Sequence, residues 1–100
     1  MKKTKRKEKD IVVACAWYRK EQWAMLRAAS LDRDELEESY EEWLSAAEGH
    51  FKNYKASGMN IVKQDIDVRA LIDWCREENL PLDGKARARF ACKTFEDKMA

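Results

Sequence analysis

Five residues with chemically useful side chains stand at the ends of two short apolar segments. Trp17, Tyr18 and Arg19 end the first segment, and Asp65 and Asp67 end the second. If both segments are parallel strands, these side chains share the sheet edge at which open α/β sheets bind ligands. Two carboxylates, a guanidinium and aromatic rings could hold a small molecule or a phosphate there. We favour the structural alternative, in which Asp67 caps a helix, Trp17 is part of the core and Arg19 forms a local ion pair.

Basic side chains gather in two further places and suggest contact with nucleic acid. The first set is Lys2, Lys3, Lys5, Arg6 and Lys7, and the second is Lys85, Arg87, Arg89 and Lys93. Together they could neutralise several phosphates, with an affinity that falls as salt rises. However, Arg87 and Arg89 are two residues apart and diverge around a helix, and no known nucleic-acid-binding motif accompanies them. We favour a solubilising tail and a solvated helix face, with weak non-specific nucleic-acid binding as the alternative.

The residue types that catalysis and metal binding need are scarce. His50 is the single histidine, whereas a typical catalytic zinc site uses two or three. Cys15, Cys75 and Cys92 are odd in number and widely spaced, which fits neither a disulfide framework nor a zinc site. The chain also lacks the G-x-S-x-G, P-loop and H-E-x-x-H motifs. We predict no catalytic residue, no metal and no cofactor, and lean towards a protein that is not an enzyme.

Length and charge indicate one small domain behind a basic leader. One hundred residues, 45% apolar and 39% charged, suit a single globular domain over residues 11–100. Residues 1–10 carry six Lys or Arg and two acids, which predicts a disordered leader. The longest apolar run has eight residues, whereas a membrane span needs about 20. Widely spaced cysteines without a disulfide pattern fit a reduced, cytoplasmic protein.

The clearest hydrophobic pattern predicts a long helix over residues 34–54. Its apolar residues recur at steps of three and four and therefore share one face. They are Leu36, Tyr40, Trp43, Leu44, Ala47, Phe51 and Tyr54. Asp32 or Asp34 would cap the start of this helix, and Gly58 would supply the left-handed residue after its end.

The remaining elements are two strands and three shorter helices. Residues 11–18 are β-branched and apolar on both faces, which suits a buried strand, although their Ala-Cys-Ala centre would also tolerate a helix. Residues 60–66 suit a second, partly exposed strand. The predicted helices cover residues 20–29, residues 68–78 and residues 84 or 85 to about 98, and Asp67 and Asp83 would cap the second and third of them. In the last helix we expect the core-facing residues to be Ala88, Cys92 and Phe95, flanked by Phe90 and Ala91.

This order of elements predicts a helix-dominated α/β fold, with α+β as the alternative. Two strands joined by a long helical crossover most simply lie parallel. A sheet of two strands is marginal by itself and needs helices on its faces or strands from another subunit. We therefore expect a homodimer. Four Trp exceed what a minimal core needs, and Trp and Tyr are favoured at protein interfaces, which supports the same expectation.

Several short motifs resemble a family of short uncharacterised bacterial proteins. The likeness spans roughly residues 12–92. It rests on Ala16-Trp17-Tyr18-Arg19, Tyr40-x-x-Trp43-Leu44-x-x-Ala47-Glu48, Val62-Lys63-x-x-Ile66-Asp67, Trp74-Cys75 and Ala86-Arg87-Ala88-Arg89-Phe90-Ala91. The resemblance implies a bacterial, cytoplasmic source and a leader outside the shared part, and it implies no activity.

From the sequence we expect a small cytoplasmic protein that is not an enzyme and acts through protein–protein contacts. Weak non-specific nucleic-acid binding and a ligand site or small active site at the strand ends are the two alternatives.

Overall fold

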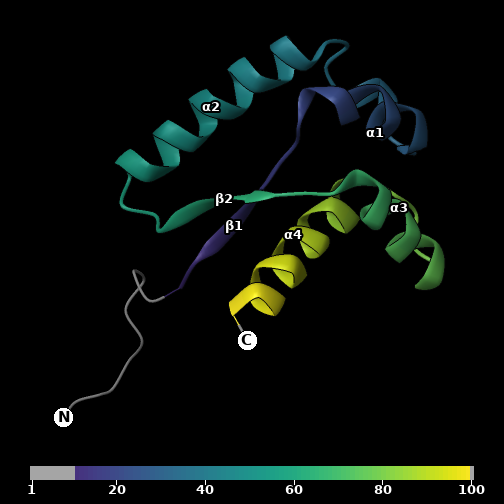
Figure 1. Cartoon of the computed structure of the whole chain (residues 1–100). Coiled ribbons are helices and arrows are strands. Elements are labelled where there is room, and N and C mark those ends of the chain that lie inside the picture. The colour runs from purple at the N-terminus through teal and green to yellow at the C-terminus, as the bar shows by residue number, and fades with distance from the viewer. Residues whose placement is uncertain (1–10, 100) are drawn as a thin grey trace.

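Two parallel strands form the centre of the fold, with helices on both sides (Figure 1). The computed structural model describes residues 11–99, so the predicted basic leader lies outside the described residues. The helix-dominated α/β prediction is confirmed. The elements run in the order β1 (Val13–Trp17), the 3-10 helix η2 (Lys20–Gln22), α1 (Trp23–Ala29), the 3-10 helix η3 (Arg33–Glu35), α2 (Tyr40–Ala56), β2 (Ile61–Asp65), α3 (Val68–Glu77) and α4 (Gly84–Met99).

The two strands pair in a register that runs from Val13 opposite Ile61 to Trp17 opposite Asp65. The helices α2 and α4 lie on opposite sides of this ribbon (Figure 1). Trp17 packs its ring on α2, so the side chains of alternate residues, Ala14 and Ala16, face the α4 side.

The largest fully buried apolar side chains lie where α1, α3 and the end of β2 meet. Leu26, Ile66, Val68 and Leu71 are at most 1% exposed. Each such aliphatic side chain contributes about 1.5–3 kcal/mol when it leaves water. The main core therefore lies beyond the carboxyl ends of the strands, and the strands themselves extend away from it.

The helix that the sequence predicted over residues 34–54 is shorter at its start. Residues 33–35 form η3, Leu36 is extended, and α2 begins only at Tyr40. Ser39 is the cap: its hydroxyl accepts the Glu42 N–H at 3.1 Å, and the Glu42 carboxylate accepts the Ser39 N–H at 3.3 Å. This reciprocal capping box fixes the start of the helix, so the predicted caps Asp32 and Asp34 are wrong. The predicted left-handed glycine, Gly58, has φ +97°.

The predicted inner face of the last helix is also wrong. Ala86, Phe90 and Ala91 are buried in α4, whereas Ala88 and Cys92 are exposed and Phe95 is half-buried. Both sets recur at helical spacing, so periodicity alone could not decide which one faces the core.

The first strand is less buried than its sequence predicted. None of the residues of β1 is fully buried, and Val13 is exposed. The strand is half-exposed because β2 covers one edge only.

Candidate functional site

A groove runs along the edge of β1 that β2 does not cover. Residues 13–16 of β1 form its floor, and α2 and α4 form its walls. Its volume is about 680 Å³. The wall residues include Leu36, Trp43, Ala47, His50 and Tyr54 on the α2 side, and Gly84, Arg87 and Ala88 on α4. We call this the β1 groove, and its mainly apolar lining suits contact with another apolar surface.

A cluster of aromatic rings holds α2 over the strand and so shapes one wall of the groove. The ring of Trp43 lies 5.3 Å from that of Trp17, 5.2 Å from that of Tyr18 and 5.4 Å from that of Trp23. The Tyr40 hydroxyl donates to the Tyr18 carbonyl at 2.9 Å. Tilted and edge-on pairs of this kind each add about 0.5–1.5 kcal/mol beyond area burial. All four Trp rings therefore make contacts within the chain, three of them in this cluster and Trp74 with the Phe90 ring at 5.3 Å.

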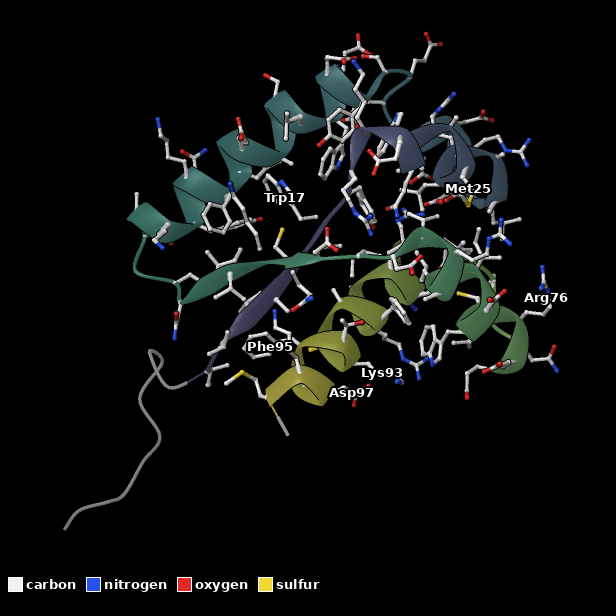
Figure 2. The ribbon with its side chains drawn as sticks, in the orientation of Figure 1. Trp17, Met25, Arg76, Lys93, Phe95 and Asp97 are labelled. Atoms are coloured by element: carbon white, nitrogen blue, oxygen red, sulfur yellow. The ribbon has the colours of Figure 1, made fainter. Side chains whose placement is uncertain are left out.

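A lysine secures the second half of α2. The Lys63 ammonium lies 4.3 Å from the centre of the Trp17 ring and 5.0 Å from that of Phe51. Figure 2 shows Trp17 directed towards α2. Cation–π contacts between β2, β1 and α2 keep the helix over the strands at this end.

The strand-end residues predicted as a ligand site are brought near one another and serve local roles. Arg19 Nε lies 3.2 Å from Asp65 Oδ1, and the two side chains are 46% and 66% exposed. Trp17 stands opposite Asp65 in the register but turns its ring to α2. Asp67 caps α3, with Oδ1 accepting the N–H groups of Arg69 and Ala70. Tyr18 is buried, and burial raises the pKa of its phenol well above the usual range.

The basic residues predicted to bind nucleic acid are divided among different environments. Lys2, Lys3, Lys5, Arg6 and Lys7 lie outside the described residues. Lys85 is exposed, and the Arg89 guanidinium lies 5.6 Å from the centre of the Trp74 ring. Lys93 forms an ion pair of 2.9 Å with Asp97, away from Phe95 on α4 (Figure 2). Arg87 turns inward, whereas the exposed Lys85, Arg89 and Lys93 recur every four residues along α4, with Lys93 paired to Asp97.

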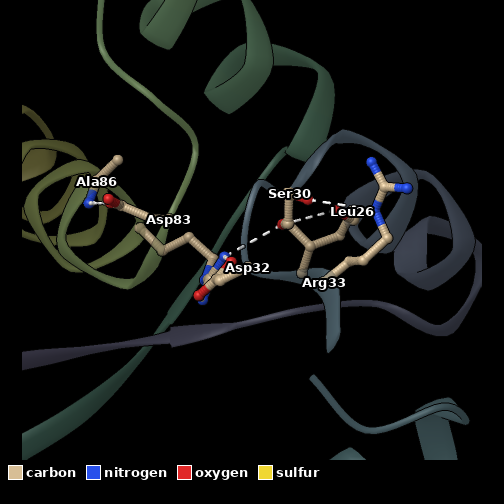
Figure 3. A network of polar contacts seen from close by, with 7 residues as sticks. Leu26, Ser30, Asp32, Arg33, Asp83 and Ala86 are labelled. Carbon is tan, nitrogen blue, oxygen red and sulfur yellow. Dashed lines mark hydrogen bonds and ion pairs between the residues drawn. The ribbon is translucent and has the colours of Figure 1, made fainter. Parts of the chain in front are cut away.

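Arg87 joins α4 to the segment after α1 through a compact polar network with Ser30 and Asp32, two residues that Figure 3 labels. Its two terminal nitrogens donate to both carboxylate oxygens of Asp32, at 2.9 and 2.7 Å, and Nη1 also donates to the Ser30 hydroxyl at 3.1 Å. The side chains of Arg87 and Asp32 are only 12% and 18% exposed. The hydrogen bond from Arg87 lowers the pKa of Asp32 below its usual value. This pair fixes the α4 wall of the β1 groove, because Arg87 lines it.

The three cysteines are free, and they occupy three different environments. Cys75 is buried, Cys15 is half-buried on the floor of the β1 groove, and Cys92 is exposed. The exposed Cys92 contradicts the prediction that this residue faces the core. Burial raises the pKa of the Cys15 thiol. His50 is exposed at the groove wall.

Sequence reasoning missed the groove, although one signal pointed to it. A sheet of two strands has two outer edges, and the apolar run at β1 is too hydrophobic for an edge strand facing water. An apolar strand in a sheet with too few strands to cover it indicates a surface that the chain itself leaves exposed.

In the part of the chain that the structure describes, no group of three or more His, Cys, Asp or Glu side chains is placed to hold a metal ion. Among the helices of residues 11–99, none combines the length and apolarity that crossing a membrane requires.

Comparison with protein-family models, with curated proteins and with solved structures found no match to this chain.

Proposed function

We propose that this protein is a small cytoplasmic interaction protein that works as a homodimer and has no catalytic activity of its own. The β1 groove is the observation that carries the proposal. It combines an uncovered strand edge with apolar walls from two helices. Exposed strand edges of this kind pair readily with other chains, and proteins therefore usually cover them.

The chemistry of the other candidate site supports contact with protein more than catalysis. Arg19 and Asp65 neutralise each other, and Asp67 is engaged at the start of α3. A catalytic carboxylate is commonly set apart by burial or by a like charge that shifts its pKa. These carboxylates are exposed instead.

Light scattering over a concentration series tests the proposal. We expect the mass of a dimer, or a rise from monomer to dimer as concentration increases. A strict monomer at the highest attainable concentration would contradict homodimer formation. A gel-shift titration on the same sample tests the alternative function, nucleic-acid binding, because such binding weakens steeply as salt rises.

A further inference from the structure

The hydrogen bonds of β1 show which backbone groups are left for a partner. Val13 N–H donates to the Asn60 carbonyl at 2.9 Å, and the Trp17 carbonyl accepts the Ile66 N–H at 3.0 Å. In a parallel pair, alternate residues bond to the same neighbour. The N–H and C=O groups of Ala14 and Ala16 therefore point to the opposite edge, into the β1 groove.

The open edge has a defined end. Tyr18 continues the outward-facing set, but its carbonyl already accepts the Tyr40 hydroxyl at 2.9 Å. Within β1, Ala14 and Ala16 are thus the two residues whose backbone groups a further strand would meet. An occupant must supply extended backbone, because such groups are satisfied by strand addition.

We propose that a second copy of the chain fills the groove, with β1 of each copy pairing antiparallel across a two-fold axis at Cys15. This inference rests on the proposed homodimer and adds its geometry. A segment that pairs with itself about a two-fold axis must run antiparallel. Ala14 of one copy then exchanges hydrogen bonds with Ala16 of the other, and a continuous four-stranded sheet results.

Charge complementarity favours a second copy as the occupant. The stretch that leads into α2 carries the acids Asp34, Glu35, Glu37, Glu38, Glu41 and Glu42 and no Lys or Arg, and we call it the acidic segment. It adjoins the carboxyl end of β1, where Glu41 pairs with Lys20 at 2.8 Å and Tyr40 bonds Tyr18. In the antiparallel pair, the amino end of the partner's β1 lies at this carboxyl end. Residue 11 of the partner then lies near the acidic segment, and the sequence that precedes it carries six Lys or Arg and two acids.

The uncovered face of α4 points to the same occupant. Ala88 lines the groove, and Cys92 and Phe95 follow it by four and seven residues, so all three share one helical face. Figure 2 shows Phe95 projecting from α4 away from Lys93 and Asp97. A two-fold axis through Cys15 and perpendicular to the sheet places both copies of α4 on the same side of the joined sheet. This face of each copy then turns towards the other.

Disulfide cross-linking tests the register. Directly opposite residues in a non-hydrogen-bonded antiparallel pair have Cα atoms about 4.5 Å apart, so the Cys15 thiols of the two copies face each other. Diamide takes two electrons and two protons from such a pair and leaves one disulfide. The reaction is run at pH of about 8.5, because burial raises the pKa of Cys15. We expect a covalent dimer from the wild type and from Cys92→Ser, and none from Cys15→Ser.

A matched variant controls for chance collision. In this register Val13 faces Trp17 of the partner, so Val13→Cys combined with Cys15→Ser and Cys92→Ser should not cross-link to itself. Cross-linking that depends on Cys92, or that is equal for a thiol at position 13, would overturn the proposed register.

A charge placed on α4 provides a second test that does not depend on thiols. Ala88→Glu is at an exposed position, so folding should persist, and it brings two like charges together where the copies of α4 meet. We expect its dimer Kd to rise at least about tenfold, because like charges juxtaposed at an interface oppose association. Ala24→Glu, exposed on α1, should leave Kd unchanged.

The outcomes separate the two proposals. A wild type that is monomeric at every concentration removes the homodimer and this geometry together. A dimer that neither cross-links through Cys15 nor weakens in Ala88→Glu keeps the proposed function and removes this geometry.

Discussion

Arg87 illustrates how one residue can change meaning between sequence and structure. In the sequence it belongs to a set of basic residues that could bind phosphate. In the fold its guanidinium is bound by Asp32 and Ser30, which lie more than fifty residues earlier. Sequence spacing predicts partners within a helix, but it has no rule for pairing residues this far apart.

Replacement of Asp32 by Asn should lower the free energy of unfolding by about 2–3 kcal/mol. The change leaves the Arg87 charge largely buried without its counter-ion, and breaking a buried pair on one side costs about 3–5 kcal/mol, less where water reaches the pair. Urea denaturation measures the difference. Asp97→Asn, which breaks the exposed pair with Lys93, should change stability by less than about 1 kcal/mol. Equal effects from the two substitutions would contradict this account.

The same residue should make stability depend on pH. Arg87 lowers the pKa of Asp32 in the folded chain, so the carboxylate contributes stability above its unfolded pKa of about 3.9. That contribution disappears as pH falls through the lowered, folded value. The gap in unfolding free energy between wild type and Asp32→Asn should therefore be constant from pH of about 5 to about 7 and shrink below about 4. A gap that stays the same in acid would exclude Asp32 as its source.

At the level of elements, local chemistry predicted most of the helix caps and strands. Asp67 and Asp83 cap α3 and α4 as expected, with Asp83 Oδ1 accepting the Ala86 N–H at 3.0 Å. The start of α2 was placed too early because Leu36 continues the apolar spacing by coincidence. Its contact with the core comes from an extended link, which periodicity cannot distinguish from a helical turn.

Two substitutions distinguish the observed start of α2 from the predicted one. Ser39→Ala should lower stability by about 1 kcal/mol, because it removes the side chain that accepts the Glu42 N–H. Asp34→Ala, at the position predicted as a cap, should have an effect below about 0.5 kcal/mol, as is usual for surface changes. Thermal unfolding followed by circular dichroism measures both. A larger loss from Asp34→Ala than from Ser39→Ala would favour the longer helix.

At the level of the whole molecule, the sequence predicted the elements and the parallel sheet. It did not predict how much apolar surface of β1 and α4 the chain leaves exposed. Apolar runs predict that side chains are buried, but they do not show whether the contacts come from the same chain or from another one. The apolar spacing of β1 and of the outer face of α4 predicts core positions, yet residues 13–16 of β1 and Ala88 of α4 line the β1 groove. If a second copy fills the groove, the sequence pattern describes the dimer's interior and not that of one chain.

The salt dependence of dimerisation should reflect the leader and the acidic segment. Raising NaCl from about 0.05 M to about 0.5 M should increase the dimer Kd several-fold, because exposed charges are screened within a Debye length that shrinks with salt. A variant without residues 2–9 should bind less tightly at low salt and lose most of this dependence. Analytical ultracentrifugation measures both. An unchanged salt dependence after the deletion would place the responsible charges elsewhere.

The long crossover between the strands affects how the protein is made. Val13 pairs with Ile61, forty-eight residues later. At a synthesis rate of roughly 5–20 residues per second, β1 leaves the ribosome about 2–10 s before the strand that it pairs with. Throughout that interval both of its edges are unsatisfied, and neighbouring nascent chains on one messenger RNA carry the same strand. Pairing between neighbouring nascent chains therefore competes with correct folding during this interval.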